Sequence, residues 1–321
     1  MKYEYTNIYL YPGYDHVFQY LLKDLENEKN CRVIDHLFDS RTAERLWEHI
    51  SKHPTIKEKT GEFFSTITAN SLILPKKVEE NQVYVFSNIA IQYIPDWELK
   101  RIKNAGAKLV LYFLDDLGNR NSRIAFEKTK RILFDAVCTF DRANAEAYGF
   151  HYVNSMYSIL ENRDVTVKYD ACFIGSDKGR FSIVESIYKK LLEQNGTFFC
   201  CVYQTDESHK QKYNNMRINE SIDYKDVTEI VRESNCIIDV VLGEQSGLSL
   251  RVYEAIAYNK KLLTNNRSIF EFPQYDERYM RYFETIEDID WRFVLQREPV
   301  DYGYKGEYSP VVFLKKVCGF L

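Results

Sequence analysis

Short apolar runs alternate with segments of helical periodicity along the chain. In the first half, runs typical of strands occur at 8–11, 31–34, 83–86, 108–114 and 136–140. Helices are predicted at 17–28, at 41–52, after Pro95-Asp96, at 122–134, and between a capping Asp141 and a closing Gly149. Because strands and helices alternate, this half is predicted to form a doubly wound α/β sheet.

The second half repeats the alternation after an interruption at 155–168, where periodicity is lost and the sequence becomes polar. Strands are predicted at 169–174, 197–203, 236–242, 261–264 and 281–283, and helices at 181–194, 225–234, 248–258 and 289–296, before an amphipathic tail at 309–321. The 321 residues are enough for two domains that each bury a core. We expect an N-terminal domain at 1–154, a linker at 155–168 and a C-terminal domain at 169–321.

The stretch from Cys236 to Asn266 is the most informative part of the sequence. A nearly continuous apolar run, typical of a strand buried on both faces, leads into the loop Gly243-Glu244-Gln245-Ser246-Gly247 and then into a helix. The first turn of a helix presents free backbone N–H groups, so this strand–loop–helix unit predicts an anion site. Arg251 and Glu254 share one face of the helix, where Arg251 can bind phosphate and Glu254 can accept from sugar hydroxyls.

A second loop of the same kind opens the C-terminal domain. Gly175-Ser176-Asp177-Lys178-Gly179-Arg180 follows the strand at 169–174 and precedes a helix. Its glycines and two cations, Lys178 and Arg180, are typical of a phosphate-binding loop. The alternative is a turn exposed to solvent whose arginine only caps the next helix.

The amino-acid sequences of several segments resemble those of the GT-B glycosyltransferases, most of all a bacterial branch that acts in capsule and lipopolysaccharide assembly. The segments are FDAVCTFDRANAEAYGF, CFIGSDKGR and QSGLSLR…EAIAYNKKLLTNN. In many such enzymes two glutamates with seven residues between them flank the donor loop and helix, and the second binds the ribose of a nucleotide-sugar. Glu254 matches the second place, whereas the first falls on Ser246, a departure from the family pattern.

The resemblance implies a GT-B fold, with two Rossmann-like doubly wound parallel-sheet domains facing a central cleft. The C-terminal domain would bind the nucleotide-sugar donor, with Arg180 or Lys178 on the pyrophosphate and Glu254 on the ribose. The last helix would cross back onto the first domain, and GT-B enzymes as a class need no metal, so neither metal nor other cofactor is expected. The implied donor-binding residues are Gly175, Lys178, Arg180, Ser246, Gly247, Arg251 and Glu254.

Two pairs of neighbouring residues in the N-terminal domain, one Asp-His and one Asp-Asp, are candidates for binding or activating the sugar acceptor. Asp15-His16 follows the first strand and Asp115-Asp116 follows the strand at 108–114, at the edge where open α/β sheets bind ligands. Either pair can contact or deprotonate an acceptor hydroxyl. The alternatives are a helix cap and a surface histidine for the first pair, and a turn and cap or a metal ligand for the second.

Five cations between residues 120 and 131 stand against the single Glu127. They are Arg120, Arg123, Lys128, Lys130 and Arg131. Such a cluster is suited to the inner membrane surface or to a lipid pyrophosphate acceptor, with a solvated helix face as the alternative.

The net charge and the positions of the cysteines indicate which ligands and which cellular compartment to expect. The net charge of −4 disfavours a nucleic-acid binder. The seven cysteines lie mostly in apolar runs without metal-type spacing, as in a reducing compartment. Because no apolar run is long enough to span a bilayer and the N-terminus lacks the order of a signal peptide, we expect a cytoplasmic location, with peripheral contact to the membrane as an option.

Three functions are therefore considered. The first is a glycosyltransferase that moves a sugar from a nucleotide-sugar to a saccharide or lipid-linked saccharide acceptor in bacterial surface polysaccharide synthesis. The second is a GT-B-like scaffold or chaperone without activity, favoured by Ser246 at the place of the first glutamate. The third is a sugar-nucleotide epimerase on the same fold. A Rossmann oxidoreductase is disfavoured, since no glycine fingerprint follows the first strand.

Overall fold

The computed structural model describes residues 5, 7–13, 16–51, 54–160, 165–213, 215–242 and 246–321. The chain divides into two compact units. Unit 1 comprises Met1–Met156 together with Ser309–Leu321, and unit 2 comprises Tyr157–Tyr308.

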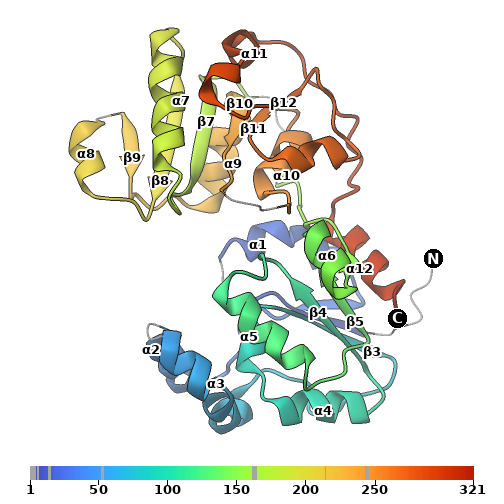
Figure 1. The fold of residues 1–321 in the computed structure, drawn as a ribbon. Coiled ribbons are helices and arrows are strands. Elements are labelled where there is room, and N and C mark those ends of the chain that lie inside the picture. Colours follow the sequence, from blue (N-terminus) through green and yellow to red (C-terminus); the bar gives the residue numbers. More distant parts are fainter. Residues whose placement is uncertain are drawn as a thin grey trace. The chain divides into compact units, whose positions relative to one another are not determined.

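Unit 1 is built on a six-stranded parallel sheet with the strand order β2-β1-β3-β4-β5-β6. Figure 1 labels three of its strands, β3, β4 and β5. The strands are β1 (Asn7–Tyr11), β2 (Cys31–Val33), β3 (Gln82–Ser87), β4 (Lys108–Phe113), β5 (Ala136–Thr139) and β6 (His151–Tyr152). The central strand β3 is buried at every position, which explains its almost continuous apolar sequence.

Helices cover both faces of this sheet. They are α1 (Phe18–Leu21), α2 (Arg41–Ser51), α3 (Pro54–Thr68), α4 (Asp96–Asn104), α5 (Arg120–Thr129), α6 (Arg142–Tyr148) and α12 (Pro310–Cys318), with the 3-10 turns η1 (Lys23–Asn27), η2 (Ala69–Ser71) and η3 (Ile91–Tyr93). Residues of α2, α4 and α5 share one apolar core with alternate residues of β1, β3 and β4.

The C-terminal helix α12 belongs to unit 1, although about 150 residues of unit 2 precede it. The ring of Phe313 packs on Tyr112 of β4, with ring centroids 4.7 Å apart. Ser309 caps the helix, and its hydroxyl donates to the Asp24 carboxylate at 2.7 Å. The helix is thus anchored to unit 1 at its first turn and along its apolar side.

Unit 2 contains a second six-stranded parallel sheet, in the order β12-β11-β10-β7-β8-β9. Its strands are β7 (Tyr169–Ser176), β8 (Phe198–Tyr203), β9 (Met216–Ile218), β10 (Ser234–Asp239), β11 (Lys261–Thr264) and β12 (Met280–Tyr282). Its helices are α7 (Phe181–Glu193), α8 (Ser208–Lys212), α9 (Tyr224–Arg232), α10 (Leu250–Ala257) and α11 (Trp291–Leu295), with the 3-10 turns η4 (Arg267–Glu271) and η5 (Ile286–Asp288). Helices α7 and α11 share a core with one set of alternate strand residues.

Several predicted elements differ from those observed. The helix expected at 17–28 is divided into α1 and η1. Helix α3 (Pro54–Thr68) was not among the predicted helices, because a proline that follows a predicted helix indicates the end of that helix. Proline is also favourable at the first position of a new helix, where its missing N–H costs no hydrogen bond, and α3 begins there. The strand expected at 236–242 is β10, which starts at Ser234 and ends at Asp239.

Candidate functional site

The order of the strands in unit 2 creates a switch point between β7 and β10. The chain continues from β7 to β8 on one side and from β10 to β11 on the other. Open parallel sheets bind ligands outside the carboxyl ends of their strands at such a point, because the two connections diverge there. The two loops that the sequence singled out follow β7 and β10, so the topology brings them to the same edge.

The guanidinium of Arg180 lies across the ends of both central strands. Its Nε donates to the carbonyl of Ser176 at 2.8 Å, and its Nη1 donates to the carbonyl of Val240. A side chain at Gly175 would place its Cβ 2.7 Å from Arg180 Nη2, so a glycine is needed for this close approach. Burial lowers the pKa of Arg180, and the nearby Asp239 carboxylate opposes that shift.

The loop between β7 and α7 is closed by its own aspartate. The Asp177 carboxylate accepts from the N–H groups of Gly179 at 3.0 Å and Phe181 at 2.8 Å, and from the Thr205 hydroxyl at 2.7 Å. Burial would raise the pKa of Asp177, but these hydrogen bonds hold it below its usual value. Since these two N–H groups are already used, the cations Arg180 and exposed Lys178 are what this loop offers an anion.

A buried carboxylate, which the sequence did not single out, fixes the loop after β10. Asp239 is only 3% exposed and accepts hydrogen bonds from Ser249 at 2.8 Å and Thr264 at 2.9 Å. Burial raises the pKa of Asp239, against the hydrogen bonds from Ser249 and Thr264 and the charges of Arg180 and Arg251. A charged residue inside an otherwise apolar run was the available signal.

Two consecutive asparagines after β11 hold the rest of this loop. Asn265 exchanges two hydrogen bonds with the backbone of Val241, at 2.7 and 2.9 Å. Asn266 donates to the carbonyl of Gly247 at 3.1 Å. The backbone on both sides of residues 243–245 is therefore tied to β11, and those three residues of the predicted loop lie outside the described part of the chain.

Helix α10 starts later than expected. Its N-cap is Ser249, whose hydroxyl accepts from the N–H of Arg251, so the helix begins at Leu250 and not at the predicted residue 248. A serine hydroxyl at the N-cap satisfies a first-turn N–H, which sets the start of the helix there. Ser246 and buried Gly247 precede the helix, at the same edge of the sheet.

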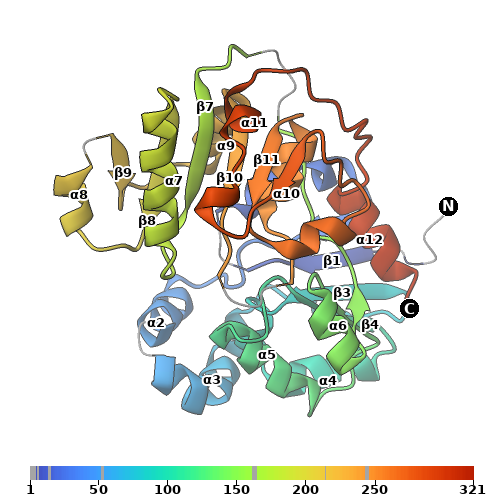
Figure 2. The same cartoon turned by 45° about the horizontal axis from the view of Figure 1, so that its top comes forward.

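The two charged residues of α10 are joined to each other. Glu254 is completely buried, and its carboxylate accepts from Arg251 Nη1 and from the Tyr224 hydroxyl, the latter at 2.7 Å. Helix α10 packs against β10 and β11, beside which it lies in Figure 2. Burial would lower the pKa of Arg251, but the Glu254 carboxylate raises it, so Arg251 stays charged. A ribose contact by Glu254 stays a prediction.

Comparison with known proteins identifies the architecture. The structure matches the lipopolysaccharide outer core galactosyltransferase WaaB in its apo form, with a TM-score of 0.51, 12% identity and 98% of each chain covered. It also matches a UDP-N-acetylglucosamine 2-epimerase from Rickettsia bellii, with a TM-score of 0.52, 10% identity and coverage of 98% of this chain and 96% of that one. The chain has the GT-B fold. No family model and no curated protein sequence matches it.

Three of the four acceptor-side candidates, His16, Asp115 and Asp116, are described, and they follow β1 or β4 of the unit 1 sheet. Asp15 is outside the described residues, and His16 is exposed in a turn. Asp116 accepts from the N–H of Gly118 at 2.7 Å and from the Asn144 side chain at 3.2 Å, which is the geometry of a turn. The carbonyl of Asp115 accepts from Ser122. Within the described residues, no group of three or more His, Cys, Asp or Glu side chains could hold a metal ion.

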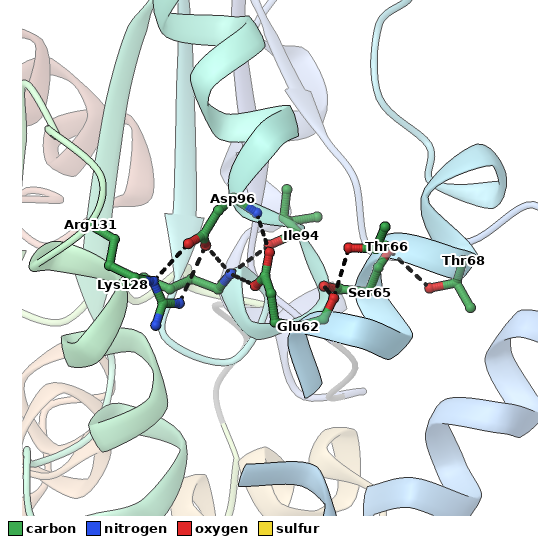
Figure 3. A network of polar contacts seen from close by, with 8 residues as sticks. All are labelled: Glu62, Ser65, Thr66, Thr68, Ile94, Asp96, Lys128 and Arg131. Carbon is green, nitrogen blue, oxygen red and sulfur yellow. Dashed lines mark hydrogen bonds and ion pairs between the residues drawn. The ribbon is translucent and has the colours of Figure 1, made fainter. Parts of the chain in front are cut away.

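The basic cluster between residues 120 and 131 does not form one exposed face, contrary to the sequence-based hypothesis. Lys128 is only 2% exposed. Its ammonium donates to Ile94 O at 2.8 Å, Glu62 at 2.9 Å and Asp96 at 2.8 Å, inside the network of Figure 3. Arg131 pairs with Asp96, and Lys130 pairs with Glu127. The carboxylates that remove Lys128 from the surface come from α3 and α4.

No helix in the described ranges combines the length and the apolar character that a membrane crossing requires.

Proposed function

We propose that this protein is a glycosyltransferase that moves a sugar from a nucleotide-sugar to a saccharide or lipid-linked saccharide acceptor, in bacterial surface polysaccharide synthesis. The observation that carries the proposal is the arrangement at the switch point of unit 2. There the Arg180 guanidinium spans the ends of β7 and β10, and Arg251 lies in the first turn of α10. Two arginines and a helix N-terminus at one sheet edge favour a diphosphate.

In this proposal the leaving nucleoside diphosphate is the group that the site stabilises. Negative charge builds on that group as the glycosidic bond to the donor breaks, so fixed positive charge lowers the barrier. Arg180 is the principal contact, with Gly175 providing its space and Lys178 available from solvent. Ser246 and Gly247 supply backbone groups before α10. Glu254 binds the ribose after its carboxylate exchanges its present partners for sugar hydroxyls.

The acceptor is assigned to unit 1, where Asp15, His16, Asp115 and Asp116 are the candidates for the base or for acceptor contact. Parallel sheets offer their carboxyl edge to ligands, and all four residues follow β1 or β4. A cytoplasmic location, with contact to the inner membrane surface for a lipid-linked acceptor, belongs to the same proposal.

An epimerase acting on a nucleotide-sugar is the second candidate, and the observation that favours it is the fold shared with the Rickettsia bellii epimerase. The two activities differ in their need for an acceptor. An epimerase converts the nucleotide-sugar alone, whereas a transferase releases nucleotide in proportion to the glycosylated acceptor. A scaffold without activity would do neither.

Nucleotide binding is the first test. Purified protein is heated with UDP, GDP, CMP, dTDP or ADP, and a stabilisation that grows with nucleotide concentration is expected for one of them. A free nucleotide concentration of one hundred times Kd is expected to increase the free energy of unfolding by about 2.7 kcal/mol. No shift with any of the five would contradict the donor site and favour the scaffold.

The role of Arg180 is tested by calorimetry with a matched control. Arg180→Ala is expected to weaken nucleoside diphosphate binding about tenfold or more while nucleoside binding changes little, because the lost contact is charge-assisted. The control is Arg297→Ala, which removes a surface arginine of unit 2 that pairs with Asp170. Equal losses for diphosphate and nucleoside would show that Arg180 does not contact the pyrophosphate.

A further inference from the structure

The chain passes between the two units twice. One crossing lies between Met156 and Tyr157 and the other between Tyr308 and Ser309. On the unit 2 side the crossings are joined, because the N–H of Tyr157 donates to the carbonyl of Tyr308 at 2.8 Å. On the unit 1 side Ser309 is anchored at once by its bond to Asp24. The residues next to both crossings are therefore hydrogen-bonded within their own units.

Helix α10 packs on both crossing segments through Tyr253, in its middle, and through Tyr258, its C-cap. The ring of Tyr253 meets that of Tyr308 edge to face, with centroids 5.0 Å apart. Tyr258, which follows the helix, meets the ring of Tyr157 in the same way at 6.1 Å. Its hydroxyl also accepts from the N–H of Leu160 at 3.2 Å. Tyr157 and Tyr253 are almost fully buried, so these contacts are parts of a packed interior.

The N-terminal end of the same helix is at the candidate diphosphate site. Ser249 caps it there, and Arg251 lies in its first turn. Eight residues of α-helix are about 12 Å long, so one short rigid element reaches from the site to the crossings. Glu254, between the two ends, is held by Arg251 on one side and by Tyr224 of α9 on the other.

We infer that α10 couples occupancy of the unit 2 site to the two chain crossings. A bound nucleoside diphosphate contacts Arg251 and the N-terminus of α10. Packed helices respond to such a contact by small rigid shifts rather than by bending. The shift changes how Tyr253 and Tyr258 pack on Tyr308 and Tyr157. This inference rests on the proposed function in one respect, since the site must bind a nucleotide.

Hydrogen exchange at two backbone amides measures the coupling between nucleotide binding and the chain crossings. The N–H of Tyr157 reports on the bond between the crossings, and the N–H of Leu160 reports on the hydroxyl of Tyr258. Exchange is measured on the full chain with and without the diphosphate that gives the largest thermal shift among UDP, GDP, dTDP and ADP. We expect the nucleotide to change exchange at both amides about fivefold or more, the lower end of typical coupling between sites.

Three variants, each lacking one phenol hydroxyl, complete the test. In Tyr258→Phe and in Tyr157→Phe the response of the Tyr157 amide to nucleotide is expected to be lost, while binding persists in calorimetry. In the control Tyr188→Phe, whose ring packs on Phe198 and Tyr213, the response is expected to remain. Nucleotide binding without any change at the two amides of the unmodified chain would overturn the inference and leave the proposed function intact. Absence of binding would overturn both.

Discussion

Replacing Lys128 by methionine is expected to destabilise unit 1 by roughly 1–4 kcal/mol. The ammonium donates three hydrogen bonds. When it is removed, the three acceptors differ in how easily water or another donor can replace it. The carbonyl of Ile94, a fully buried residue, loses a donor that water cannot easily replace, which costs about 1–3 kcal/mol. Methionine fills the volume of the lysine stem, so a cavity contributes little.

Removing the ammonium costs less free energy at the carboxylates of Asp96 and Glu62 than at the Ile94 carbonyl. Asp96 keeps Arg131 Nε at 2.7 Å, and the side chain of Glu62 is 44% exposed, so water replaces the ammonium there. An exposed pair of that kind is worth about 0–1 kcal/mol. The sum stays at or below the 3–5 kcal/mol typical of breaking a fully buried ion pair.

Urea unfolding measures this loss, provided that the signal comes from unit 1. The chain has three tryptophans, and a Trp291→Phe background leaves Trp47 and Trp97, both in unit 1. The control is Lys130→Met, two residues away, where the lysine is 56% exposed and pairs with Glu127. That control is expected to change stability by less than about 0.5 kcal/mol. If both variants lost the same amount, or Lys128→Met lost less than about 1 kcal/mol, the network of Figure 3 would not stabilise the unit as argued.

Two further predictions concern unit 2. Gly175→Ala is expected to weaken nucleoside diphosphate binding about tenfold with little change in unfolding temperature, because the new methyl group displaces the Arg180 guanidinium; unchanged affinity in calorimetry would contradict this. Glu185 accepts from Lys212 and Tyr213, which lower its pKa to about 2, so its stabilising contribution is present above pH 4.5 and disappears as the pH falls towards 2. Glu185→Gln should therefore be less stable than the unmodified protein at pH 7, by about 1 kcal/mol after solvent screening, and equally stable at pH 2 by chemical denaturation.

Much of the fold follows from the order of residues along the chain. Strand and helix periodicities depend on neighbours two to four positions apart, so β3, β11 and α7 occur close to where the sequence predicts them. The short helix α6 has its predicted cap at Asp141 and its left-handed Gly149, since capping is also a local interaction. The parallel order of the strands then brings the two glycine-containing loops to one edge.

The partners of charged groups were decided by the tertiary structure alone. The acceptors of Lys128 lie 66, 34 and 32 residues away in sequence, and the hydroxyl that meets Glu254 lies 30 residues away. A charge pattern on one helix shows neither which helix covers it nor whether that neighbour supplies a carboxylate. Lys128 therefore looked like part of a basic surface, although it is buried.

The same reason applies to Asp239 and to the last helix. Asp239 looks like an interruption of an apolar strand until Ser249 and Thr264, 10 and 25 residues further on, surround it. Ser309 meets Asp24 across 285 residues. Local periodicity determines which elements form, because it acts within a few residues. Which buried polar groups meet depends on the packing of those elements, because an unpaired buried charge is too costly to leave and its partner comes from wherever the fold brings one.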